Sequence, residues 1–276
     1  MNKLLNANLS RLFKSRVFLV CAGFMAVYAV VACLFCSYYG IGVSVDVLLL
    51  STYGLGGMIT VAGIVMAALC SMFIGTEFSD GTIRNKLVVG HGRIQIYLAN
   101  FITCAIAGIV LNLVYGILIC AIGIPMFGGF QLEAGTLLCI ILDGLLIMVS
   151  YAAMFNLLAM LLANKTTASV ISLIGVVVVM CLCAYLILRL SEPQITDLYN
   201  LVDGEYVMTR GLNPYYIEGS KRTISQFVID LLPSGQSLQL SGMSAPYFWP
   251  LSLYSLGVVL AANTVGILAF RKKDLK

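Results

Sequence analysis

The largest group of charged and titratable side chains in the first two-thirds of the sequence lies in one short segment between long apolar runs. Within seventeen residues this segment, residues 72–93, carries Glu77, Asp80, Arg84, Lys86, His91 and Arg93. Carboxylates and guanidinium groups at this spacing can form charge-assisted hydrogen bonds with one another or with a partner protein. The segment is therefore the first candidate for a functional surface.

Motifs of nucleotide-binding and hydrolytic enzymes are absent from the sequence. No G-x-x-x-x-G-K-[ST] occurs, the single histidine excludes H-E-x-x-H, and no G-x-S-x-G is present. The nine cysteines lie in apolar runs or at their edges, where cysteine behaves as a small hydrophobic residue. We therefore expect no catalytic residues, no metal site, no disulfide framework and no cofactor held by this chain.

One acidic residue, Asp143, lies inside an apolar run. A charge near the bilayer centre costs about 2.5–3.5 kcal/mol, and less at shallower depth, so such a residue usually faces a partner or a watery cavity. It is a candidate for contact with a substrate or a cation, or alternatively an acid that is paired locally or reaches the interface. Asn112, in the preceding apolar run, is either a second candidate for the substrate path or a polar group of helix packing.

Composition places the chain among membrane proteins. The sequence is 61% hydrophobic and only 10% charged, far below the charged fraction of soluble domains. Runs long enough to cross the bilayer predict an all-α protein with six membrane spans, at residues 17–35, 52–73, 96–122, 136–163, 168–188 and 248–270. Glycines and Pro125 should end the third span at 122. We expect one transmembrane domain over 1–276, with an outer region, 189–247, between spans five and six.

The basic residues predict the orientation. With both termini inside, 12 of the 16 Lys and Arg residues fall in inner segments, and the other four share one long loop that the positive-inside rule weighs lightly. Both termini and the segment 72–93 are therefore expected in the cytoplasm. Residues 1–16 read as an amphipathic helix in the membrane surface, with Leu5, Leu9, Leu12 and Phe13 on its apolar face; the alternative is a frayed basic tail.

The outer region contains a second amphipathic pattern. Apolar residues from Ile224 to Leu232 repeat with helical spacing, Thr223 and Gln226 fit a capping box, and Pro233 and Gly235 should stop the helix. This helix is expected to lie at the outer face or to dip inward as a re-entrant hairpin. It is either an outer gate or a cap that only seals the spans, and the gate residues would be Phe227, Leu231, Leu232 and Pro233.

The polar segment resembles a known family. Residues 77–87, EFSDGTIRNKL, and 90–93, GHGR, are similar to the E-F-x-x-G-T-I-R-x-K-L … G-x-x-R segment of permeases of type-2 ABC (ATP-binding cassette) transporters. Residues 213–216, NPYY, 232–236, LPSGQ, and the ending 270–275, FRKKDL, resemble bacterial members. The resemblance implies a dimer of permease subunits, identical or homologous, each bound by a separate ATPase subunit that holds ATP and Mg²⁺.

In that family the segment between spans two and three is a short coupling helix that docks into a cleft of the ATPase, the substrate path lies between the permeases, and an elbow helix precedes the first span. The resemblance assigns coupling to Glu77, Gly81, Thr82, Ile83, Arg84, Leu87 and Arg93.

Local chemistry suits a coupling helix. Ser79 or Asp80 is expected to cap a helix that opens near Gly81, and Gly90 and Gly92 should end it. Ile83 and Leu87 are one turn apart and should form an apolar knob, flanked by an Arg84 that Glu77 holds by charge-assisted bonds.

The expected function is that of the permease of a bacterial plasma-membrane exporter. Its cargo would be a hydrophobic or amphipathic molecule: an antimicrobial peptide, a drug or a lipid-like compound, as for resistance exporters of the family. The alternatives are an ion-coupled carrier or channel that uses Asp143, and a membrane sensor or scaffold without transport. A nucleic-acid partner is not expected, because no basic cluster exceeds residues 271–273.

Overall fold

Six long apolar helices form the body of the protein. The computed structural model describes residues 1–54, 59–202 and 205–273. Its membrane-length helices are α2 (Arg16–Tyr38), α4 (Val61–Ser79), α6 (Arg93–Phe127), α7 (Ala134–Leu162), α8 (Lys165–Ser191) and α11 (Trp249–Lys272). Each is long and apolar enough to cross a bilayer, which confirms the prediction of a multi-pass, mostly helical membrane protein.

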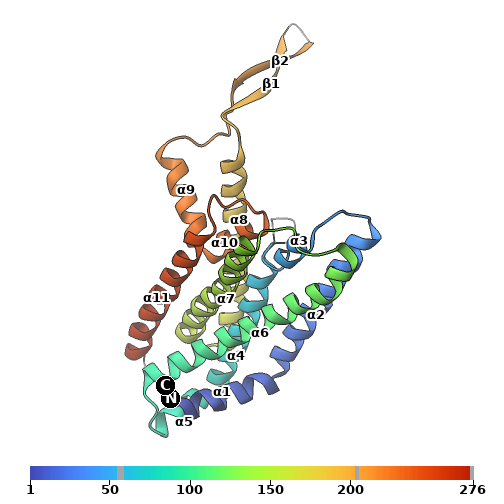
Figure 1. The fold of residues 1–276 in the computed structure, drawn as a ribbon. Helices are drawn as coiled ribbons and strands as arrows, with labels where there is room; N and C mark the ends of the chain where they lie inside the picture. The colour runs from blue at the N-terminus through green and yellow to red at the C-terminus, as the bar shows by residue number, and fades with distance from the viewer. Residues whose placement is uncertain (55–58, 203–204, 274–276) are drawn as a thin grey trace.

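The shorter elements gather at the two ends of this bundle (Figure 1). At one end lie α1 (Asn2–Lys14), α5 (Thr82–Val88) and the end of α11. At the other lie α3 (Val45–Leu50), α9 (Ser220–Leu231), α10 (Pro233–Ser241) and a hairpin of β1 (Ile195–Val202) and β2 (Glu205–Leu212). The segment 72–93 thus shares an end with the N-terminal helix.

Two predicted span boundaries are wrong. Residues 52–54 form a turn after α3, and α4 begins only at Val61, where the Thr60 hydroxyl accepts a hydrogen bond from the Gly63 N–H. The third span continues through Pro125 and ends at Gly128, whose φ is 89°. Pro125 lies in the last turn of this helix. Because proline has no N–H to donate, the helix loses one backbone hydrogen bond there, and only a short piece of helix follows that could bend.

At two places where segments of the chain approach closely, a tyrosine ring packs directly against a glycine. A Cβ atom added to Gly266 of α11 would stand 2.0 Å from the Tyr97 hydroxyl of α6. At Gly144 of α7 it would stand 2.1 Å from the hydroxyl of Tyr53. Small residues let helix backbones approach in membranes, and here the space they leave is filled by an aromatic ring.

The outer region is more ordered than a loop. The hairpin pairs Ile195 with Leu212 through Val202 with Glu205 in antiparallel register, and it projects from the bundle (Figure 1). Sequence patterning missed both strands. The expected amphipathic helix is present as α9, but the capping box is wrong: the helix starts at Ser220 after Gly219, so Thr223 lies inside it.

Pro233 does stop α9, but it also opens α10, which was not foreseen. All residues from Pro233 to Leu240 are buried against α7, α8 and α9. The polar side chains of α10 are satisfied inside the protein: Gln236 donates to the Asp230 carbonyl (2.6 Å) and accepts from the Ser255 hydroxyl (2.6 Å). Helix α10 is thus packed inside the protein, whereas α9 keeps Ile224 and Phe227 exposed.

The turn between α9 and α10 yields a first prediction. A Cβ atom at Gly235 would lie 2.2 Å from the Ile229 carbonyl oxygen and 2.7 Å from its Cα, both rigid backbone atoms. Gly235→Ala should therefore lower the free energy of unfolding by about 2–3 kcal/mol, as overpacking does. Gly257→Ala is the matched control, since nothing lies within 4 Å of its Cβ position on α11. Thermal unfolding in detergent should separate the two variants, and equal midpoints would contradict the close approach.

Candidate functional site

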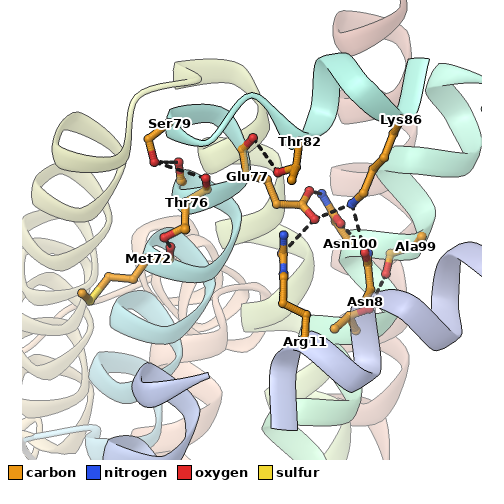
Figure 2. A network of polar contacts seen from close by, with 12 residues as sticks. Asn8, Arg11, Met72, Thr76, Glu77, Ser79, Thr82, Lys86, Ala99 and Asn100 are labelled. Atoms are coloured by element: carbon orange, nitrogen blue, oxygen red, sulfur yellow. Dashed lines mark hydrogen bonds and ion pairs between the residues drawn. The ribbon is translucent and has the colours of Figure 1, made fainter. Parts of the chain in front are cut away.

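Glu77, near the end of α4, is a fully buried carboxylate at the centre of an ion cluster. Its Oε1 atom lies 2.8 Å from Nη2 of Arg11 and forms a short ion pair with Nζ of Lys86. The three residues come from α4, α1 and α5 (Figure 2). A buried carboxylate is tolerated only when paired and hydrogen-bonded, and both conditions are met here.

Two asparagines complete the cluster. Asn100 of α6 donates from Nδ2 to Oε2 of Glu77 (2.7 Å) and accepts from Nδ2 of Asn8 (2.7 Å), while the Asn8 Oδ1 accepts from Lys86 (2.9 Å) (Figure 2). Both asparagines are buried. The Arg11 guanidinium also lies 4.2 Å from the centre of the Phe73 ring. Helices α1, α4, α5 and α6 are therefore joined by one closed polar network.

The N-terminal helix contributes a different face from the one predicted. Its buried residues are Leu4, Asn8 and Leu12, whereas Phe13 is 45% exposed. Arg11, which lies outside the predicted apolar stripe, points at Glu77. The signal that could have revealed the network is a polar residue, Asn8, at the middle of a Leu4–Leu12 stripe with a spacing of four residues.

The connection between α4 and α5 is made by backbone geometry rather than by a side-chain cap. Gly81 is the residue before α5 and adopts a left-handed conformation with φ 67°, which a glycine adopts without strain. The Thr82 hydroxyl donates to the Glu77 carbonyl (2.9 Å). Ser79 and Asp80 do not cap the helix; the Ser79 hydroxyl turns back to carbonyls of α4. The expected capping role of these two residues is therefore wrong.

The proposed apolar knob is likewise not at the surface. Ile83 is 2% exposed and Leu87 is half-buried against the core, so both fix α5 to the body of the protein. Glu77 does not hold Arg84, which is exposed. The side chains that α5 presents outward are Arg84 and Asn85, followed by Val88 at 83% and Val89 at 77% exposure. We call these four residues the α5 tip.

Arg93 fastens the start of α6 to the end of α11. Its Nη1 donates to the carbonyls of Phe270 (3.2 Å), Arg271 (3.1 Å) and Lys273. Lys273 in turn donates from Nζ to the carbonyls of Met160 (3.0 Å) and Leu161, at the end of α7. Cations at helix C-termini satisfy orphan carbonyls and oppose the negative end of the helix dipole. Arg93 therefore positions the helices beside α5 and is not part of the tip.

The two candidates for a substrate path have different hydrogen-bond partners. Asp143 is 1% exposed and accepts a short hydrogen bond from the Ser252 hydroxyl of α11, and its Oδ2 has no hydrogen-bond partner among the described residues. Asn112 instead donates to the Tyr53 hydroxyl (2.6 Å) and lines an apolar cavity between α3, α6 and α7. Tyr53 is close to both: its hydroxyl accepts from Asn112, and its ring lies on Gly144, the residue after Asp143.

The residues expected to form an outer gate differ in burial, from the buried Pro233 to an exposed Phe227. Phe227 is 50% exposed and meets the Tyr254 ring edge-on at a centroid distance of 5.9 Å, whereas Leu231 and Leu232 are half-buried. The residue that anchors α9 is Ile229, at 2% exposure, on a face that the pattern did not single out. Asp230 accepts from Gln226 (2.8 Å) and Gln239 (2.9 Å) and ties α9 to α10.

The sequence was also compared with known proteins. No family model matches the chain, and a search of the curated proteins found no match. A functional assignment therefore depends on the resemblance of residues 77–93 and on the geometry of the ion cluster and the α5 tip.

The ion cluster makes a prediction about Lys86. Burial lowers the pKa of the Lys86 ammonium, an effect that the attraction of Glu77 only partly opposes. Burial therefore makes the charged form of Lys86 less favourable than it is in water. If Lys86 were removed, Glu77 would still pair with Arg11 and accept from Asn100. Lys86→Met, which preserves the buried stem, should lower the free energy of unfolding by only about 1–2 kcal/mol, because Glu77 keeps Arg11 and Asn100 and only the hydrogen bonds of Lys86 are lost.

The sign of the pH dependence follows from the same shift. The unfolded chain retains the ordinary Lys pKa, so between the lowered folded value and 10.5 it binds more protons than the native state, and stability should rise with pH in that alkaline window. Lys86→Met should remove this increment relative to wild type in unfolding curves recorded across that window. An unchanged pH slope would contradict the lowered pKa.

Proposed function

We propose that this chain is the permease subunit of an ATP-driven exporter, with α5 as the coupling helix that contacts a separate ATPase subunit. The observation that carries the proposal is the α5 tip. Two adjacent valines and Arg84 are exposed on a seven-residue helix whose base is fixed by the buried Glu77 cluster. Exposed apolar residues beside an arginine are typical of the centre of a protein–protein contact.

The cluster explains how force applied at the tip would reach the membrane helices. Lys86 of α5 shares Glu77 with α4 and α1, and Asn100 extends the same network to α6. A displacement of α5 must move these helices with it or break the ion pair between Lys86 and the buried Glu77. ATP binding in the partner would thus drive a joint rearrangement of α1, α4 and α6.

In this proposal the exporter is a dimer of permeases, identical or homologous, in a bacterial plasma membrane, with α1 as the elbow helix and both termini in the cytoplasm. Its cargo is hydrophobic or amphipathic: an antimicrobial peptide, a drug or a lipid-like molecule. The two ends of the bundle support this topology, because α1, α5 and the basic end of α11 share one end and the folded outer region occupies the other (Figure 1).

The decisive experiment is reconstitution with an ATPase encoded beside the gene for this chain. Co-purification from detergent, ATP hydrolysis that depends on this chain, and ATP-dependent efflux of a membrane-active peptide from reconstituted vesicles are expected together. An ATPase that neither binds this chain nor changes its hydrolysis rate in its presence would reject coupling and favour a membrane sensor or scaffold.

A second candidate function is an ion-coupled carrier or channel, and it is favoured by the buried Asp143 carboxylate with its unpartnered Oδ2. Asp143→Asn retains the acceptor for the Ser252 hydroxyl but removes the charge. If Asp143 binds a cation or cargo, transport should fall by about tenfold or more, equivalent to 1.4 kcal/mol, while the protein remains folded. Unchanged transport with a normal unfolding midpoint would assign Asp143 to packing alone.

A further inference from the structure

An apolar cavity of about 640 Å³ lies between α3, α6 and α7, at the end of the bundle opposite α5. Its volume falls within the range of small-molecule sites, about 300–1,000 Å³. Among the described lining residues, Asn112 and Tyr53 supply the side-chain nitrogen and oxygen atoms, and all the others are apolar, glycine or cysteine. The interior therefore offers a hydrocarbon-like surface.

The two polar side chains of the cavity are hydrogen-bonded to each other. Asn112 donates from Nδ2 to the Tyr53 hydroxyl at 2.6 Å, and the Tyr53 ring is fixed because it lies on Gly144 of α7. A buried water needs two to four polar partners, and a cavity without them stays dry and accepts apolar molecules. Water is therefore a poor occupant of this space.

The mouth of the cavity faces the surroundings of the membrane helices. Leu113 and Ile117 lie one turn apart on α6 and are 49% and 65% exposed, and Ile141 on α7 is 39% exposed. Both helices are of membrane-crossing length and composition, so the medium outside this mouth is bilayer hydrocarbon. What lies next to the opening is thus a lipid chain rather than water.

We propose that this cavity binds one acyl chain of a membrane glycerolipid, which enters sideways between α6 and α7. Left empty, the lining side chains would lack contact atoms on one side and lose dispersion attraction, which a flexible chain restores. The bound chain would support α3 and the Tyr53–Gly144 contact, next to Asp143. The site is separate from the α5 tip and does not depend on the coupling role.

The test uses the full chain in proteoliposomes that contain phosphatidylglycerol with a photoactivatable diazirine in one acyl chain. After irradiation, digestion and mass spectrometry should find lipid adducts concentrated in residues 113–121 and 137–145, several-fold above those on the exposed faces of α2 and α8. Gly116→Phe should remove most of this excess, because only Leu49, at 3.5 Å, meets a Cβ atom there and the ring must enter the cavity.

Gly175→Phe on α8 is the matched control, since nothing lies within 4 Å of its Cβ position, and its adduct pattern should equal wild type. Gly116→Leu, a smaller change, keeps the test valid if the phenylalanine variant does not fold, and it should reduce the excess partially. Evenly spread adducts, or an excess that survives both Gly116 variants, would overturn the proposal. So would efficient Ile117→Cys cross-linking between two copies in the same vesicles, which would show that a second copy covers the mouth.

Discussion

Replacing Glu77 with alanine should lower the free energy of unfolding by about 3–5 kcal/mol, because it removes the only carboxylate of a buried cluster and leaves two cations behind. Arg11 and Lys86 would then face each other without the anion that holds them, and Asn100 would lose the acceptor for its amide. Chemical or thermal unfolding in detergent, and yield of folded protein after membrane extraction, measure the effect. The loss should greatly exceed that of Lys86→Met.

The matched control is Asp80→Ala, which removes an acid three residues away that is exposed. Its free energy of unfolding should stay within about 0.5 kcal/mol of wild type, as for ordinary surface substitutions. If Glu77→Ala and Asp80→Ala unfold at the same temperature, the buried cluster does not form in the membrane. The family resemblance assigns both Glu77 and Arg84 to coupling; in the structure Glu77 is buried in the ion cluster, whereas Arg84 is exposed.

The spans were predictable because length and composition act on each helix independently. Residues 168–188 were assigned from their apolar content alone, and the observed α8 extends them by only three residues at each end. The N-terminal helix was predictable too, but not its buried face. Asn8 and Asn100 are 92 residues apart in the chain, and no local pattern indicates that one amide will donate to the other.

Neither the presence nor the burial of helix α10 could be predicted from its sequence. Its Ser and Gln residues give it the composition of a surface segment, yet Pro233–Leu240 are buried. Burial is possible because the partners come from elsewhere: Gln239 donates to Asp230, and Tyr151 of α7 donates to the Ser234 hydroxyl at 3.2 Å. Polar groups inside a protein follow the availability of hydrogen-bond partners, which a single sequence window does not contain. Ile83, read as part of a docking knob, is buried in the hydrophobic core instead.

If α5 is the coupling helix proposed above, introducing charge at its tip should abolish coupling while leaving the chain folded. Val88 and Val89 make few contacts within the chain, at 83% and 77% exposure, so Val88→Asp with Val89→Asp costs little stability. Docked into a partner, the two carboxylates would be buried without cations, and buried unpaired charges at an interface cost about 2–5 kcal/mol. Permease-dependent ATP hydrolysis and ATPase co-purification should fall by at least about tenfold, the equivalent of 1.4 kcal/mol.

Three variants distinguish docking at the tip from a general effect of substitution. Val170→Asn on α8 replaces another exposed valine, 49% exposed, outside the tip and should leave ATPase binding unchanged. Arg84→Ala keeps the valines and should weaken binding less than the double aspartate, whereas Ile83→Ala should reduce stability, because Ile83 is a buried anchor. If the double aspartate variant binds and stimulates the ATPase as wild type does, α5 is not the coupling element, and the contact between this chain and any motor subunit must lie elsewhere.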